Sequence, residues 1–119
     1  MDEVINETFF KATELHSAGD FELASQLYGA VIKIRPEHAE ANHNMGLLKI
    51  ETGLEIEALQ YFWTAVQTDK SSSKYWVSYI NLLITLNKLN EAVESLRLIA
   101  ENGLKDDKFY KLAHLANAP

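Results

Sequence analysis

A repeat of 34 residues constrains this chain more than any other feature of its sequence. Turn-forming and small residues recur at this interval, at Gly19, Gly53 and Asn87 and at Ala24, Ala58 and Ala92. The segments around them align without an insertion. A fixed period of this length is typical of a stacked repeat, because one helical pair cannot bury its apolar face without neighbours. The sequence therefore predicts an array of similar helical pairs that offers a binding surface.

Composition agrees with one soluble domain over residues 1–119, since 47% of the residues are hydrophobic and 24% are charged. The chain has no cysteine, which excludes disulfides, thiolate zinc sites and cysteine nucleophiles. It also lacks a signal-peptide pattern and a long apolar run, so we expect a cytoplasmic protein. The net charge of -6 makes nucleic acids and anionic membrane surfaces poor partners.

Glycine and proline are rare and mostly stand between apolar stretches, which predicts a chain that is helical almost throughout. Gly19 is expected to end the first helix in the left-handed conformation, and Asn87 takes that role in the third unit. Asp20 and the run 71–73 offer side chains that can cap the next helix. The expected helices cover about 4–18, 21–34, 38–52, 55–68, the stretch from 73 to about 86, 89–102 and 108–117.

Apolar residues at three-and-four spacing predict the buried face of each helix. In the first pair these are Ile5, Phe9, Ala12 and Leu15, followed by Leu23, Ala24, Leu27, Tyr28 and Val31. In the second pair they are Ala41, Met45, Leu48, Ala58, Phe62 and Ala65. In the third pair they are Trp76, Tyr79, Ile80, Leu83, Ala92, Leu96 and Ile99. The recurring alanine lets two helices approach closely, and the aromatic residues fill the space between pairs.

This arrangement of small and aromatic residues, with Gly46 in the second unit and Pro36 closing the first, resembles the tetratricopeptide repeat (TPR) family. The resemblance implies an all-α fold of about seven helices, a right-handed superhelical α-solenoid of antiparallel helix pairs. It places repeats at about 5–38, 39–72 and 73–106 and a capping helix at about 107–117. Departures from the family pattern include Asn42, where an aromatic residue is usual, and Lys70 and Leu104, where proline is usual.

In the family's geometry the first helix of each pair lines a concave groove. Carried onto this chain, the resemblance implies these contacts for a bound peptide or helix: Phe9, Thr13, His43, Asn44, Leu47, Lys74, Val77, Ser78, Asn81 and Lys111. This mixture of apolar and polar side chains suits an extended peptide or an amphipathic helix. Ile50 and Ile84 have two interpretations. They either add apolar side chains to this groove or are buried as core between neighbouring helices.

Some family members hold the C-terminal carboxylate of a chaperone tail with a five-residue polar clamp. In this chain Asn44 and Lys74 match that clamp, whereas Phe9, Thr13 and Ser78 do not. A carboxylate needs several convergent donors to replace its water, so this clamp is not expected here. We expect Asn44 and Asn81 to hold a different peptide instead, partly through the backbone amide groups of that peptide.

The second helices carry one unusual residue, Trp63, where the other repeats have Gly29 and Arg97. It is interpreted either as a contact on the convex surface or as a side chain partly buried along its own helix.

The four histidines do not have metal-binding spacing, and no phosphate loop or nucleophile motif occurs, so neither a cofactor nor catalysis is expected. The favoured function is a non-catalytic protein-protein interaction module whose concave groove binds a protein or peptide partner. Two alternatives stay open. In the first, the chain is a substrate-presenting or scaffold module of a larger enzyme, such as a glycosyltransferase, sulfotransferase or methyltransferase. In the second, it is a self-assembling scaffold that forms a weak homo-oligomer.

Overall fold

The computed structural model describes residues 1–117, and within them it contains seven helices and no strands. The helices are α1 (Asp2–Ser17), α2 (Phe21–Ile34), α3 (Ala39–Glu51), α4 (Glu55–Thr68), α5 (Ser73–Thr85), α6 (Leu89–Glu101) and α7 (Asp107–Ala116). These bounds lie within two residues of the expected ones. The all-α prediction is therefore confirmed.

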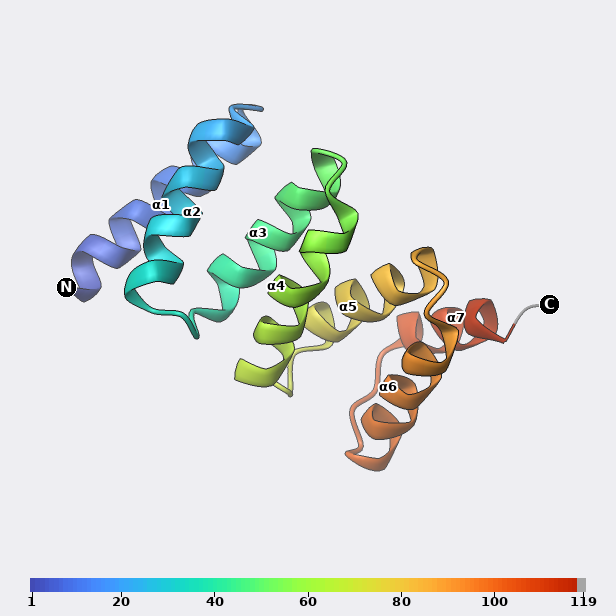
Figure 1. Ribbon diagram of the computed structural model, residues 1–119. Helices are drawn as coiled ribbons and strands as arrows, with labels where there is room; N and C mark the ends of the chain where they lie inside the picture. Colours follow the sequence, from blue (N-terminus) through green and yellow to red (C-terminus); the bar gives the residue numbers. More distant parts are fainter. Residues whose placement is uncertain (118–119) are drawn as a thin grey trace. The chain divides into compact units, whose positions relative to one another are not determined.

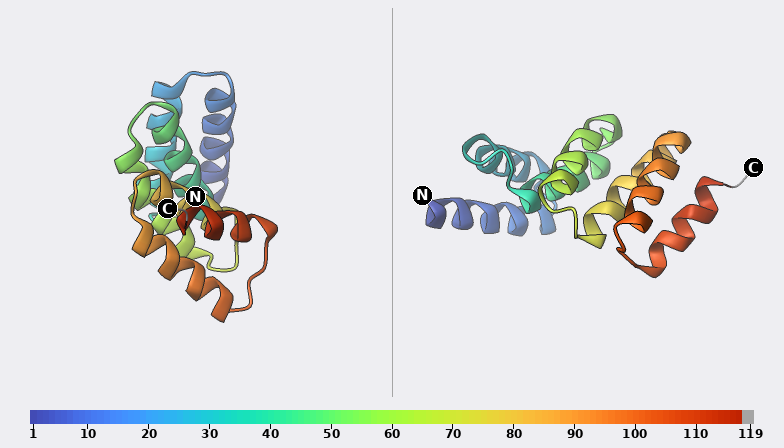
Figure 2. Two further views of the ribbon diagram at one scale, coloured as in Figure 1. Left: turned by 90° about the vertical axis from the view of Figure 1, so that its right-hand side faces the viewer. Right: turned by 90° about the horizontal axis from the view of Figure 1, so that it is seen from below.

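The helices form two compact units, Met1–Thr68 (unit 1) and Asp69–Pro119 (unit 2). In unit 1, α1 packs against α2, α2 against α3, and α3 against α4, and the successive helices of each pair run antiparallel (Figure 1). In unit 2, each of α5, α6 and α7 packs against the other two. Figure 2 shows these three helices from two further directions. The expectation of one continuous domain over 1–119 stays a prediction, and its residues 118 and 119 lie outside the described residues.

The turns inside the helical pairs follow the 34-residue period. Gly19, Gly53 and Asn87 have φ angles of 84°, 82° and 60°, so the predicted left-handed conformation is confirmed at all three. After each of them, the next backbone N–H donates to a carbonyl oxygen five residues back, at 2.7 to 2.9 Å. This bond satisfies a carbonyl that the end of a helix leaves without a partner.

The N-termini of α3, α5 and α7 are capped by His38, Ser72 and Asp106, which also stand 34 residues apart. The acceptor is Nδ1 of His38, the hydroxyl of Ser72 and the carboxylate of Asp106, at 2.8 to 3.3 Å from a backbone N–H of the first turn. Asp20 caps α2 in the same way, as expected. The cap position is thus periodic although its chemistry changes from repeat to repeat.

The core of unit 1 consists of buried side chains from α1, α2 and α3, which include Ile5, Phe9, Ala12, Ala24, Tyr28, Val31, Ala41, Met45 and Leu48. The expected buried faces are confirmed for these residues. The prediction that Leu23 is buried is wrong, since its side chain is 42% exposed. The buried face of α2 consists of Ala24, Tyr28 and Val31 instead.

Gly46 lies so close to the ring of Phe62 that a β-carbon at this position would stand 2.4 Å from it. One repeat later the equivalent residues are Ile80 and Leu96. A larger residue on the first helix is therefore matched by a smaller one on the second, as close packing requires.

Candidate functional site in unit 1

A hollow of about 480 Å³ lies on the surface of unit 1, between α1 and α3 and beside the start of α2. We call it the α1/α3 hollow, and its lining residues are Thr13, His16, Ser17, Gly19, Phe21, Tyr28, Asn44, Leu47 and Glu51. Three of the predicted contact residues, Thr13, Asn44 and Leu47, therefore come together in one place.

A chain of hydrogen bonds joins four side chains of this hollow across three helices. Nδ1 of His16 lies 3.0 Å from the hydroxyl of Tyr28, and Nε2 of His16 lies 3.0 Å from Oε1 of Glu51. The side chain of Asn44 also bonds to the Tyr28 hydroxyl. His16 is held further by edge-on contacts with the rings of Phe21 and Tyr28, at centroid distances of 5.8 and 5.7 Å.

The chemistry of Glu51 fixes the direction of its bond to His16. A carboxylate only accepts, so Nε2 of His16 carries a proton. Burial raises the pKa of Tyr28, and the charge of Glu51 adds to this effect, while the bond to Asn44 opposes it. Tyr28 therefore stays protonated at neutral pH.

Comparisons with known proteins support the fold. No protein-family model matches this chain, and neither does any curated protein. Among solved structures, MamA superposes with a TM-score of 0.80 at 24% identity, over 97% of this chain and 63% of the MamA chain. The TPR2B domain of yeast Sti1, in complex with pHsp70, gives 0.78 at 21% identity over 94% of both chains. The second TPR domain of human RPAP3, in complex with an HSP70 peptide, gives 0.79 at 18% identity over 94% of this chain and 93% of that one.

The chain has the tetratricopeptide repeat fold. The resemblance seen in the sequence is thereby confirmed for the fold. Identities this low do not carry the partners of these proteins over to this chain. The chain also spans less than two thirds of MamA, the first of these structures.

Two of the predicted contact residues lie in the core of this TPR fold. Phe9 is 7% exposed and packs against the rings of Tyr28 and His38, and His43 is 3% exposed and packs against Phe62. Their side chains support the helices that carry the hollow. We therefore leave both out of the proposed contact surface.

The other predicted contacts belong to unit 2. Lys74, Val77, Ser78 and Asn81 are on α5 and Lys111 is on α7, two helices that pack together. The two α5 residues Val77 and Ser78 are half-buried, and the other three residues are exposed. Their role as contacts stays a prediction, as does that of the exposed Trp63 on α4 in unit 1.

The sequence analysis did not predict the hydrogen bond between His16 and Glu51. These residues stand 35 apart, one repeat plus one residue, so the 34-residue period places Glu51 next to the counterpart of His16. This offset of one repeat plus one residue was the feature of the sequence from which the contact could have been predicted. Ile50, which is this counterpart, is 36% exposed, so of its two interpretations the one as core between neighbouring helices is wrong.

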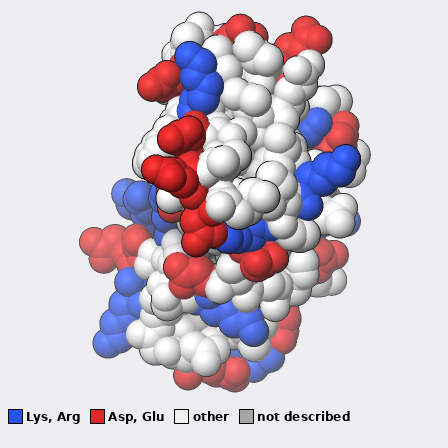
Figure 3. All heavy atoms as spheres, turned by 90° about the vertical axis from the view of Figure 1, so that its left-hand side faces the viewer, with Lys and Arg blue, Asp and Glu red and all other residues white. Residues whose placement is uncertain are grey.

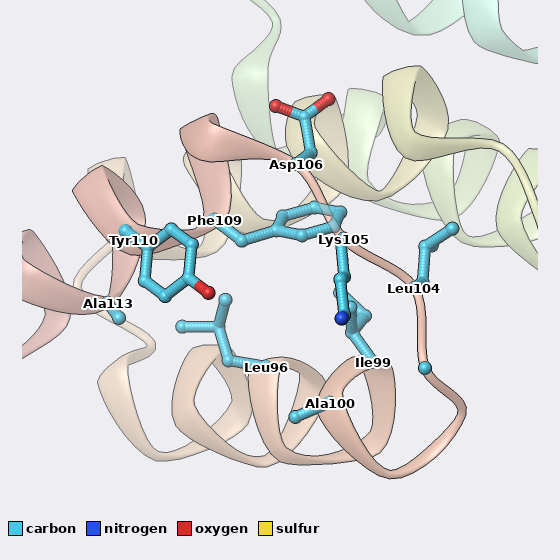
Figure 4. Close-up of a pocket in the computed structure, with 10 residues that line it drawn as sticks. Leu96, Ile99, Ala100, Leu104, Lys105, Asp106, Phe109, Tyr110 and Ala113 are labelled. Carbon is cyan, nitrogen blue, oxygen red and sulfur yellow. The ribbon is translucent and has the colours of Figure 1, made fainter.

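A second hollow, of about 260 Å³, lies in unit 2 between α6 and α7. Figure 4 shows Tyr110 of α7 and Leu96 of α6 on either side of it, with Phe109 beside them. Tyr110 is 73% exposed, whereas its counterparts one and two repeats earlier, Trp76 and Asn42, are buried.

Within residues 1–117, no group of three or more histidine or acidic side chains is placed to hold a metal ion. None of the described helices is both long enough and apolar enough to span a membrane.

Proposed function

We propose that this chain is a non-catalytic interaction module that binds an extended segment of a partner protein along the first helices of its repeats. The α1/α3 hollow is the observation that carries the proposal. It combines an apolar side chain, Leu47, with an amide, Asn44, that bonds to Tyr28. A peptide in extended conformation offers both apolar side chains and unsatisfied backbone groups to such a surface.

Two of the structural neighbours support this proposal, since the Sti1 and RPAP3 domains are seen in complex with pHsp70 and with an HSP70 peptide. The proposed contacts in unit 1 are Thr13, Asn44 and Leu47. Those proposed in unit 2 are the predicted residues Lys74, Val77, Ser78, Asn81 and Lys111.

The test is a selection from a display library of random twelve-residue peptides on the purified chain. The selected peptides are then measured by fluorescence anisotropy against the double variant Asn44→Ala/Leu47→Ser. Both residues are half-buried at the surface, so the helical circular dichroism of the variant is compared with that of the wild type. We expect the variant to lose at least tenfold in affinity, because a small polar side chain replaces an apolar contact and an amide is removed.

A matched control places the same changes on α4, away from the hollow. Ile56 and Gln67 are both exposed there, so Ile56→Ser/Gln67→Ala introduces the same chemistry elsewhere. Peptides that bind the two double variants equally well would contradict the proposal.

A further inference from the structure

The charges of this chain are unevenly divided between its units. Residues 1–68 contain eleven Asp and Glu against four Lys and Arg, a net charge of -7, whereas residues 69–119 contain six against seven, a net charge of +1. Figure 3, which faces the end that carries the N-terminus, shows acidic side chains along the border of a broad uncharged surface. The potential around unit 1 therefore attracts cations.

Most of the cations of unit 1 are engaged with carboxylates other than Glu51. Lys11 pairs with Glu14 at 3.7 Å, and Lys49 pairs with Glu57 at 3.5 Å. Arg35 pairs with Asp2. Glu51 instead contacts the imidazole of His16, whose Nε2 lies 3.0 Å from its Oε1.

Glu51 lies where a ligand can reach it. Its side chain is 44% exposed at the edge of the α1/α3 hollow, and the bond to His16 engages one of its two carboxylate oxygens, Oε1. A carboxylate in this position offers an ion pair to a cation that enters the hollow.

Asn44 lines the same hollow as Glu51, and its side chain bonds to the Tyr28 hydroxyl. An amide side chain carries an acceptor oxygen as well as N–H donors, so it can accept a hydrogen bond from a backbone N–H of a peptide.

We infer that the α1/α3 hollow binds a peptide segment with a lysine or arginine side chain, whose charge pairs with Glu51 while a backbone N–H of the segment donates to Oδ1 of Asn44. The aliphatic stem of that side chain packs against Leu47, since lysine and arginine bury their methylene groups along apolar surface. This inference rests on the proposed function and names the chemistry of the partner.

The test uses the same peptide library and asks which residues the selection enriches. We expect Lys and Arg to be enriched and Asp and Glu to be depleted among peptides whose binding depends on the hollow. The best of these peptides is then measured against Glu51→Gln, with Glu55→Gln as the control. Glu55 is exposed at the start of α4 outside the hollow, so both variants change the net charge equally.

The expected loss for Glu51→Gln is about two- to fivefold in affinity, as for a partly exposed ion pair, and about none for Glu55→Gln. A peptide in which methionine replaces the enriched Lys or Arg should bind Glu51→Gln and the wild type equally. Equal affinities of this peptide for the two proteins would show that Glu51 acts through the replaced Lys or Arg side chain.

Each result has a separate meaning. Hollow-dependent peptides without a cationic residue, or equal losses in Glu51→Gln and Glu55→Gln, would overturn the inference and leave the proposed function standing. A selection that yields no peptide sensitive to Asn44→Ala/Leu47→Ser would overturn both.

Discussion

The indole N–H of Trp76 donates a hydrogen bond to the carbonyl oxygen of Lys70 at 2.8 Å. One repeat earlier, Nδ2 of Asn42 donates to the carbonyl oxygen of Pro36 at 3.0 Å. Both donors are buried at the start of a first helix, and both acceptors lie in the turn before it. The departure of Asn42 from the family's aromatic preference is thus explained, because the amide supplies the donor that tryptophan supplies in the next repeat.

Removing either donor should destabilise its unit. Trp76→Phe should lower the free energy of unfolding by about 1 kcal/mol, for one lost hydrogen bond. Asn42→Ala should cost about 1–3 kcal/mol, since Nδ2 also donates to the carbonyl oxygen of His38 at 2.8 Å. Urea denaturation followed by circular dichroism measures both. The control is Tyr110→Phe at the exposed counterpart position, which should change stability by less than about 0.5 kcal/mol. Equal effects at all three positions would show that the turn bonds contribute nothing.

Gly46→Ala should destabilise the protein although alanine favours helices. The new β-carbon would stand 2.4 Å from the Phe62 ring, so the ring or the helix must move, at a cost of about 1–3 kcal/mol. Gly29→Ala is the matched control in the middle of α2, where the nearest atom to the new β-carbon is Cε of Met45 at 3.9 Å. That change should stabilise the protein by about 0.5–1 kcal/mol. Thermal unfolding of the two variants should therefore shift in opposite directions.

Asn87 holds a left-handed conformation that glycine holds in the two preceding repeats. Asn87→Ala should lower the free energy of unfolding by about 1 kcal/mol, because a β-carbon is strained at this φ, whereas Asn87→Gly should be close to neutral. Chemical denaturation of the two variants in parallel tests this. An alanine variant as stable as the glycine variant would mean that the turn can change its conformation.

Stability should fall at alkaline pH. Burial raises the pKa of Tyr28 and of Tyr79 above the value of 10.0 for a free phenol, and nearby glutamates add to the effect. Above pH 10 the unfolded chain loses these protons while the folded chain keeps them. The free energy of unfolding therefore decreases as the pH rises through this range and is unaffected below it.

The variant Tyr28→Phe isolates one of these groups. Its urea midpoint, measured from pH 8 to pH 11, should show a weaker decrease above pH 10 than that of the wild type. Tyr110→Phe, at an exposed phenol, is the control and should leave the slope unchanged. A slope in Tyr28→Phe identical to that of the wild type would contradict the assignment.

Periodic features could be predicted from the sequence alone. The left-handed turns at Gly19, Gly53 and Asn87 and the fully buried alanines Ala24 and Ala58 follow from local conformational preference and from close helix contact. The turn conformations and the close helix contacts depend on residues that are near in sequence or on their counterparts in the next repeat. That is why the helix bounds, the caps of α2 and α5 and most of the predicted core residues agree with the structure.

The candidate site needed the tertiary structure. Phe9 and His43 were placed on the contact surface by their repeat positions, yet the way α1 and α3 pack turns both toward the core. The same packing brings His16 within hydrogen-bond distance of Tyr28 and Glu51, which lie 12 and 35 residues away. A repeat period gives the spacing of helices along the chain, and it leaves open the rotation of each helix about its own axis. That rotation depends on how individual side chains fill the space between helices, and it decides which polar groups meet in the hollow.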